Sequence, residues 1–278
     1  MRPGRLYGVL SWGAAAAVTA VLVAMWVDLY ALHASSIEPG LIRQIDRKTI
    51  VSKFVVMVIG FSAVGIAILG VAIRTWRRSA PILLQETIEL LRSPTGAGAG
   101  EGAPRRRVGL AFAAAAREVA GGGMRECEDA QQWVGHFLTM WGFVGLFATT
   151  ALDAVVNGAA DPLPLMHPVR LLGNVTGIMF VAGLTLAMAR RALLSRARET
   201  SKLGDWMFLI SLWGTGATGF AVQWYADSAA ARATSWSYLI HLAFIGLILA
   251  AAPWSKFIHA VWRPSWVLYR QLTVDGDR

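Results

Sequence analysis

Long apolar runs alternate with polar segments along the whole chain. Six of these runs are close to the length of about 20 residues that an α-helix needs to cross the hydrocarbon core of a bilayer. They occupy residues 7–32, 54–76, 133–156, 169–190, 206–225 and 236–254. The pattern predicts an all-α membrane protein with about six transmembrane helices. Because the first run is too long for a cleavable signal peptide, we expect it to stay as a helix.

The polar segments between these runs divide the chain into four parts. Residues 1–76 hold two transmembrane helices, 77–132 form a segment outside the membrane, 133–265 hold a four-helix core, and 266–278 form a tail. The segment 77–132 begins with an amphipathic helical pattern and continues through a Gly- and Ala-rich linker that ends in a basic cluster. As the longest segment outside the membrane, it is the expected docking surface for another subunit.

Composition and charge place the chain in a membrane and orient it there. Of its 278 residues 55% are apolar and only 15% are charged, with a net charge of +9. With the N-terminus inside, the inner segments collect 20 of the 26 Lys and Arg residues. This is the positive-inside asymmetry, so the basic charge indicates orientation in the lipid bilayer and no nucleic-acid partner. Both termini are predicted to be cytoplasmic.

Two common redox and nucleotide signatures are excluded. Cys127 is the only cysteine, so the chain alone can form neither a disulfide framework nor an iron–sulfur cluster, which needs about four thiolates. Gly214, Gly216 and Gly219 spell the GxGxxG pattern, but they lie inside the run 206–225, where no βαβ unit can form. We interpret them as small residues that allow close packing in the membrane.

The five histidines lie near the two predicted membrane faces. We place His136 and His259 at the inner level, and His33, His167 and His241 at the outer level, with His241 about one turn inside its span. His241 and His259 are eighteen residues apart, which is five turns of a continuous helix. They are therefore expected on one face, about 27 Å apart. Ionisable side chains at membrane depth are costly and usually functional.

Haem b is the cofactor that fits this distribution best. Zinc needs three or four converging ligands, and a proton relay needs carboxylates in mid-membrane, where the spans offer little beyond Asp153. Haem b needs two axial imidazoles and an apolar slot, which glycines of the spans could provide. Those glycines are Gly142, Gly145, Gly173, Gly177, Gly214, Gly216 and Gly219.

Three stretches resemble the respiratory nitrate reductase gamma subunit superfamily, in a pattern closest to the membrane subunits of heterodisulfide reductases and their sulfite-reductase-linked relatives. They are APWSKFIHAVWRP (252–264), HFLTMWGFVGLFATT (136–150) and LLGNVTGIMFVAGL (171–184). The resemblance implies a haem-binding helical bundle of a membrane cytochrome b. It implies that His136 and His259 ligate an inner haem iron, and that His241 ligates an outer one.

The chain departs from this family at one ligand. Where the nitrate reductase pattern has a second histidine on the same span, this chain has Leu146. The outer haem then takes its second ligand elsewhere or is absent, so either two haems or one are expected. We prefer His167, whose neighbour Pro168 could fix a loop over the site, and keep His33 as the alternative.

The resemblance implies a subunit that transfers electrons between the quinone pool, such as menaquinone, and a cytoplasmic iron–sulfur or molybdenum partner. It would be the membrane haem subunit of a quinone-linked oxidoreductase in the cytoplasmic membrane of a prokaryote, with no active site for terminal substrate chemistry. Hydrogen-bond donors for a quinone at the outer level are His33, Asp153, Arg170 and Asn174. The alternative is a non-redox transporter or scaffold, which predicts broken helices with polar midplane residues.

Overall fold

The structure of the chain is a computed structural model. It describes residues 3–35, 58, 60, 62–77, 109, 112–114, 116–117, 120–121, 130–156, 163, 166–194, 202–228 and 230–255. Within these ranges the regular structure is entirely helical. The helices belong to two compact units. The first combines Met1–Gly60 with Glu128–Ile248, and the second combines Phe61–Cys127 with Leu249–Arg278.

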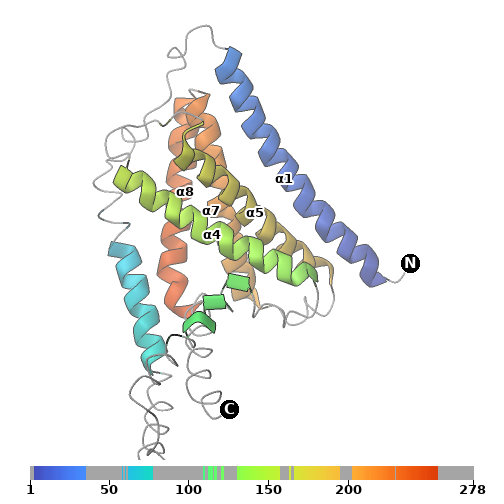
Figure 1. The fold of residues 1–278 in the computed structure, drawn as a ribbon, viewed down its shortest axis with the longest axis vertical. Helices are drawn as coiled ribbons and strands as arrows, with labels where there is room; N and C mark the ends of the chain where they lie inside the picture. The colour runs from blue at the N-terminus through green and yellow to red at the C-terminus, as the bar shows by residue number, and fades with distance from the viewer. Residues whose placement is uncertain are drawn as a thin grey trace, which may run out of the picture. The chain divides into compact units, whose positions relative to one another are not determined.

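The first unit is a bundle of long helices (Figure 1). They are α1 (Pro3–Ser35), α4 (Ala130–Val156), α5 (Pro168–Leu193), α7 (Leu203–Asp227) and α8 (Ala231–Ala251), of which the residues up to Ile248 belong to this unit. Each contains most of one predicted span, and the bounds differ from the predicted ones by up to five residues. The apolar run length sets these bounds, because a helix that crosses lipid must satisfy its backbone hydrogen bonds internally.

Four of the described helices are long and apolar enough to cross a membrane. The candidate spans are Val9–Asp28, Ala130–Val155, Pro168–Leu193 and Arg232–Trp254. The helix α7 is helical over its predicted range but is less apolar, because glycines, threonines and Gln223 interrupt it. The predicted span 54–76 lies only partly in the described residues, where 62–77 are helical. Six spans therefore stay a prediction, and a membrane protein is supported.

The helix α5 is the centre of the first unit. It packs against α4, α1 and α7, and half of the residues in its span are buried, compared with 17% or fewer in the other three candidate spans. Its most buried side chains are Phe180, Val181, Leu184 and Leu186. Phe180 and Leu184 form a core cluster with Leu212 of α7 and Ile248 of α8.

Glycines bring α4 and α5 into backbone contact. A Cβ atom added at Gly142 of α4 would lie 2.5 Å from the backbone nitrogen of Phe180, and one added at Gly183 of α5 would lie 2.7 Å from that of Thr139. No real side chain fits at such distances, so glycine is required where these helices cross. Packing of this kind replaces the hydrophobic effect as the force that associates helices in lipid.

The helix that carries His241 ends before it reaches His259. α8 ends at Ala251, a 3-10 turn follows over Ala252–Trp254, and Ser255 has an extended backbone with ψ of 177°. Pro253 explains this break, because proline has no amide hydrogen for the helical bond and its ring clashes with the preceding turn. The expectation that His241 and His259 share one face of a continuous α-helix is therefore wrong.

In the second unit, the helical residues 62–77 contact Pro253. Arg74, in the helical residues 62–77, donates a hydrogen bond from Nη1 to the carbonyl oxygen of Pro253 at 3.0 Å. Gly70 lies one turn before Arg74, and a Cβ atom added there would meet the Pro253 ring at 2.7 Å. The turn that ends α8 is thus held by a helix from the N-terminal part of the chain.

Candidate functional site

His241 lies well inside the helix α8. Because α8 begins at Ala231, five residues before the predicted start, His241 follows ten residues of helix, nearly three turns or about 15 Å along the axis. Its depth relative to the outer membrane face stays a prediction. An imidazole inside an apolar helix bundle needs polar contacts there.

Two consecutive residues of α7 supply contacts to the His241 imidazole. The hydroxyl oxygen of Thr218 lies 3.1 Å from Nδ1. A Cβ atom added at Gly219 would lie 3.3 Å from Cε1, so the ring packs closely over this glycine. One and a half turns earlier on α7, Gly214 accommodates the Phe244 ring in the same way. The face of α7 that bears Gly214, Thr218 and Gly219 therefore receives two aromatic rings from α8.

The other predicted haem ligands are only partly described. His136 lies six residues into α4, and its side chain is exposed on the surface of the first unit. Next to it in sequence, Phe137 stacks on Trp133 with ring centroids 5.3 Å apart. His259 lies outside the described residues, as does the side chain of His33. The pairing of His136 with His259 stays a prediction.

His167 has a structural role in the described fold. It is the N-cap of α5, and its Nδ1 accepts a hydrogen bond from the backbone N–H of Val169 at 3.3 Å. In a neutral imidazole the nitrogen that accepts is unprotonated, so the proton is on Nε2. A haem iron bound through Nε2 needs the opposite tautomer. His167 would have to give up this cap to become an axial ligand.

Arg170, a predicted quinone donor, forms an ion pair with Asp227. The Asp227 side chain is only 3% exposed, and Arg170 Nη1 also donates to the carbonyl oxygen of Leu163 at 2.9 Å. The pair joins the first turn of α5 to the last residue of α7. At the opposite ends of these two helices, Arg191 lies 3.6 Å from Asp205. The two pairs show that α5 and α7 are antiparallel and match in length.

Among the described quinone candidates, Asn174 has an amide donor without a hydrogen-bond acceptor. It is 4% exposed, and its Nδ2 has no hydrogen-bond acceptor among the described residues. Two contacts give the level of Asn174 along the antiparallel helix α7. On α5, Arg170 pairs with Asp227 of α7, and Gly177 lies against Phe220 of α7. Asn174 lies midway between Arg170 and Gly177, at the level of Trp224. Asp153 lies one turn from the end of α4 and has polar contacts in the fold.

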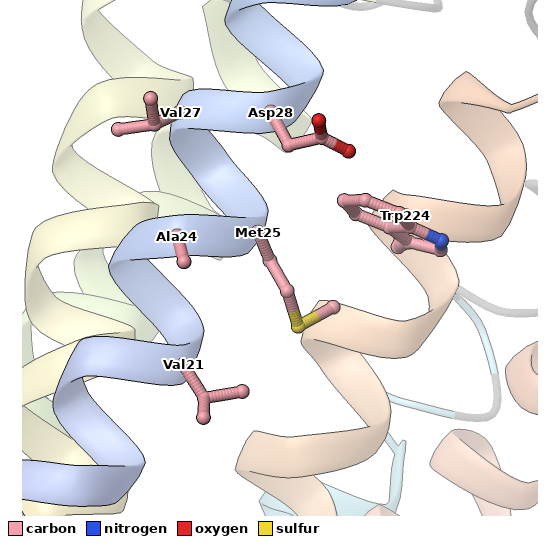
Figure 2. Close-up of a pocket in the computed structure, with 6 residues that line it drawn as sticks. All are labelled: Val21, Ala24, Met25, Val27, Asp28 and Trp224. Carbon is pink, nitrogen blue, oxygen red and sulfur yellow. The ribbon is translucent and has the colours of Figure 1, made fainter.

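An open groove of about 620 Å³ lies between α1 and α7 at this level. Figure 2 shows Met25 and Asp28 extending from α1 toward Trp224 of α7, while Val27 points away. The lining is largely apolar, with the Asp28 carboxylate at one end. The groove could accept a flat, apolar molecule with a polar head.

The described glycine faces are mostly filled by neighbouring helices. All seven glycines expected to form a haem slot lie against side chains or backbone of other helices, and for Gly219 the neighbouring side chain is His241 of α8. The GxGxxG glycines lie within α7, which confirms their role in close packing. Within the described part of the chain, no three His, Cys, Asp or Glu residues gather as a metal site.

Comparison with known proteins finds a distant relative among the curated proteins. The chain is 28% identical over 148 residues to a subunit of the dihydromethanophenazine:CoB–CoM heterodisulfide reductase of Methanosarcina barkeri (strain Fusaro / DSM 804). The match covers 47% of this chain and 55% of the relative, so the chain spans about half the length of the curated relative it matches. No protein-family model matches the chain. No solved structure matches it.

The similarity agrees with the heterodisulfide reductase part of the expected resemblance. The wider relation to the nitrate reductase gamma superfamily stays a prediction. Sequence reasoning did not find Thr218, Asp227 or Trp224, because their roles depend on which helices face each other. Of these three residues, only the role of Asp227 could have been predicted, because an acidic residue at the end of a predicted span needs a cation nearby.

Proposed function

We propose that this chain is the membrane electron-transfer subunit of an oxidoreductase complex, and that it holds b-type haem with His241 as an axial ligand. The observation that carries the proposal is the imidazole of His241, ten residues into the helix α8 and held by polar contact to α7. The similarity to a heterodisulfide reductase subunit supports the redox class.

The residues around His241 fit such a group on one axial side. The ring packs over Gly219, where an added Cβ atom would require it to move by a few tenths of an ångström, and Thr218 contacts the nitrogen that would face away from the iron. A b-type haem supplies one-electron transfer at its iron. His136 and His259 are proposed as ligands of a second haem, and His167 or His33 as the partner of His241.

The test is the haem content of the purified full-length chain. We expect a Soret band and α-band in the reduced protein, and loss of one haem per chain in His241→Ala. His167→Asn preserves the N-cap of α5 and removes only the imidazole, so loss of this haem in the variant would assign His167 as the partner of His241, and retention would assign His33. Colourless wild-type protein would favour the transporter or scaffold alternative, and unchanged haem in His241→Ala would remove this ligand.

We propose that the groove between α1 and α7 receives the head of a quinone or a similar lipid-soluble electron carrier. The largely apolar lining supports a flat ring, and Asn174, which does not itself line the groove, has an unpartnered amide at the level of Trp224. Arg170 forms an ion pair with Asp227. Asn174 is therefore a better donor to a quinone than Arg170.

The quinone proposal is tested with Asn174→Leu. We expect quinol-dependent reduction of the haem to fall about tenfold, because one hydrogen bond contributes about 1–1.5 kcal/mol. Dithionite reduction should be unchanged. Thr150→Val is the control, because it removes an exposed hydroxyl that is hydrogen-bonded within α4. If quinol reduction is intact in Asn174→Leu, the carrier binds elsewhere.

The partner in this proposal is a cytoplasmic iron–sulfur or molybdenum subunit that carries the substrate chemistry. The similarity to a subunit of a heterodisulfide reductase supports a redox partner for this chain. The segment 77–132 remains the proposed docking surface. Its deletion should release the partner while membrane insertion and haem content of the chain persist.

A further inference from the structure

Three polar contacts meet at the hydroxyl group of Thr218. Its oxygen lies 2.6 Å from the carbonyl oxygen of Gly214, 3.3 Å from that of Thr215 and 3.1 Å from Nδ1 of His241. A carbonyl oxygen can only accept, and a threonine hydroxyl has a single hydrogen to donate. The two carbonyl oxygens therefore take that hydrogen, mainly through the short contact to Gly214, and the lone pairs of the hydroxyl oxygen face the imidazole.

We infer that Thr218 holds the proton of His241 on Nδ1 and leaves Nε2 as the ligand nitrogen. The only way for Nδ1 to complete a hydrogen bond with a lone pair is to donate its own hydrogen. A neutral ring then carries no hydrogen on Nε2, which keeps a lone pair for a metal. Metal-ligating histidines commonly donate their second N–H to a neighbouring oxygen in this way.

Gly219 fixes the position of the same ring. A Cβ atom at this residue would stand 3.3 Å from Cε1 and 3.8 Å from Nδ1 of His241. The first distance is shorter than an ordinary van der Waals contact, so a side chain here would push the ring from Thr218. Thr218 and Gly219 are therefore positioning residues: one sets the tautomer, and the other sets the distance between α7 and the ring.

The contrast with His167 shows that the tautomer is set locally. In His167 the backbone N–H of Val169 donates to Nδ1, which forces the proton to Nε2 in the neutral ring. In His241 an acceptor faces the same nitrogen. These contacts favour opposite tautomers for the two rings, and that of His241 suits ligation through Nε2. This inference rests on the proposed haem only for the identity of the ligand.

The tautomer is measured directly by ¹⁵N NMR of the full-length chain, labelled with ¹⁵N-histidine and studied in lipid nanodiscs before haem is added. The His241 signals are those that disappear in His241→Ala. We expect Nδ1 in the protonated range and Nε2 in the unprotonated range. Thr218→Val removes the acceptor at nearly constant shape, so the Nε2-protonated tautomer should appear.

Haem retention gives the second readout. Loss of an outer hydrogen-bond partner typically lowers metal affinity about 10- to 100-fold, and we expect Thr218→Val to weaken haem binding in this range. Thr218→Ser keeps the hydroxyl and should restore both the tautomer and the affinity. Thr215→Val is the matched control, because the Thr215 hydroxyl donates to the Ser211 carbonyl oxygen within α7.

The outcomes separate this inference from the proposed function. A wild-type His241 with its proton on Nε2 overturns the inference, and so does a Thr218→Val variant with the wild-type tautomer and affinity. If the chain binds no haem but His241 is Nδ1-protonated and responds to Thr218→Val, the proposed function fails and the orientation of the ring stands.

Discussion

At the scale of single residues, the ion pair between Arg170 and Asp227 shows what the sequence could not reveal. Arg170 was expected to be a quinone donor because it lies at the outer end of a span. The fold places it against an aspartate that is 3% exposed and 57 residues away in the chain. A residue type and its depth can be predicted from the sequence, whereas its partner depends on the register between two helices.

The ion pair between Arg170 of α5 and Asp227 of α7 leads to a prediction about stability. Arg170→Met should destabilise the chain by about 3–5 kcal/mol, because it leaves a buried carboxylate without its guanidinium partner. Arg191→Met, at the other end of the same helix pair, is the control. Its side chain is 29% exposed and its distance to Asp205 is 3.6 Å, so the loss should be about 0–1 kcal/mol.

The measurement is reversible unfolding of the purified variants in mixed micelles. The double variant Arg170→Met with Asp227→Asn should recover part of the loss, because it removes the charge that the single variant strands. Equal losses in Arg170→Met and Arg191→Met would show that burial does not distinguish the two pairs.

At the scale of elements, the helices were predictable and their contacts were not. Apolar runs gave the ranges of α1, α4, α5, α7 and α8 within a few residues, since a bilayer demands a minimum length of helix. The end of α8 was also readable in principle, because Pro253 is visible in the sequence. The eighteen-residue spacing of His241 and His259 predicted a continuous helix, although Pro253 lies between them.

The crossing of α4 and α5 leads to a second stability prediction. Gly142→Ala should destabilise the bundle by about 1–3 kcal/mol, because the new Cβ atom would meet the backbone of Phe180, which cannot rotate away. Gly246→Ala on α8 is the matched control, since its Cβ atom would meet nothing within 4 Å. That change should be neutral or slightly stabilising.

Thermal unfolding of the two variants in the same detergent decides the point. A Gly142→Ala variant as stable as wild type would mean that α4 and α5 do not approach as closely as described. A loss in Gly246→Ala of the same size would point to a general effect of replacing glycine in these helices.

At the scale of the whole molecule, the path of the chain through the membrane depends on α7. By apolarity alone this helix is not among the four candidate spans. It is nevertheless 25 residues long, and ion pairs join both of its ends to the two ends of α5, a candidate span of 26 residues. A helix tied in this way to a spanning neighbour covers the same thickness.

We therefore predict that α7 crosses the membrane, with Leu203 at the cytoplasmic face and Ser228 at the outer face. Both residues are exposed and lie at opposite ends of the helix. In a Cys127→Ala background, which removes the single cysteine, Leu203→Cys and Ser228→Cys each give one reporter thiol. A membrane-impermeant thiol reagent added to intact cells should label Ser228→Cys, and Leu203→Cys should react only after the cells are opened. Labelling of both from the same side would place α7 at the membrane surface, and the span count and the shared cytoplasmic side of both termini would then have to be revised.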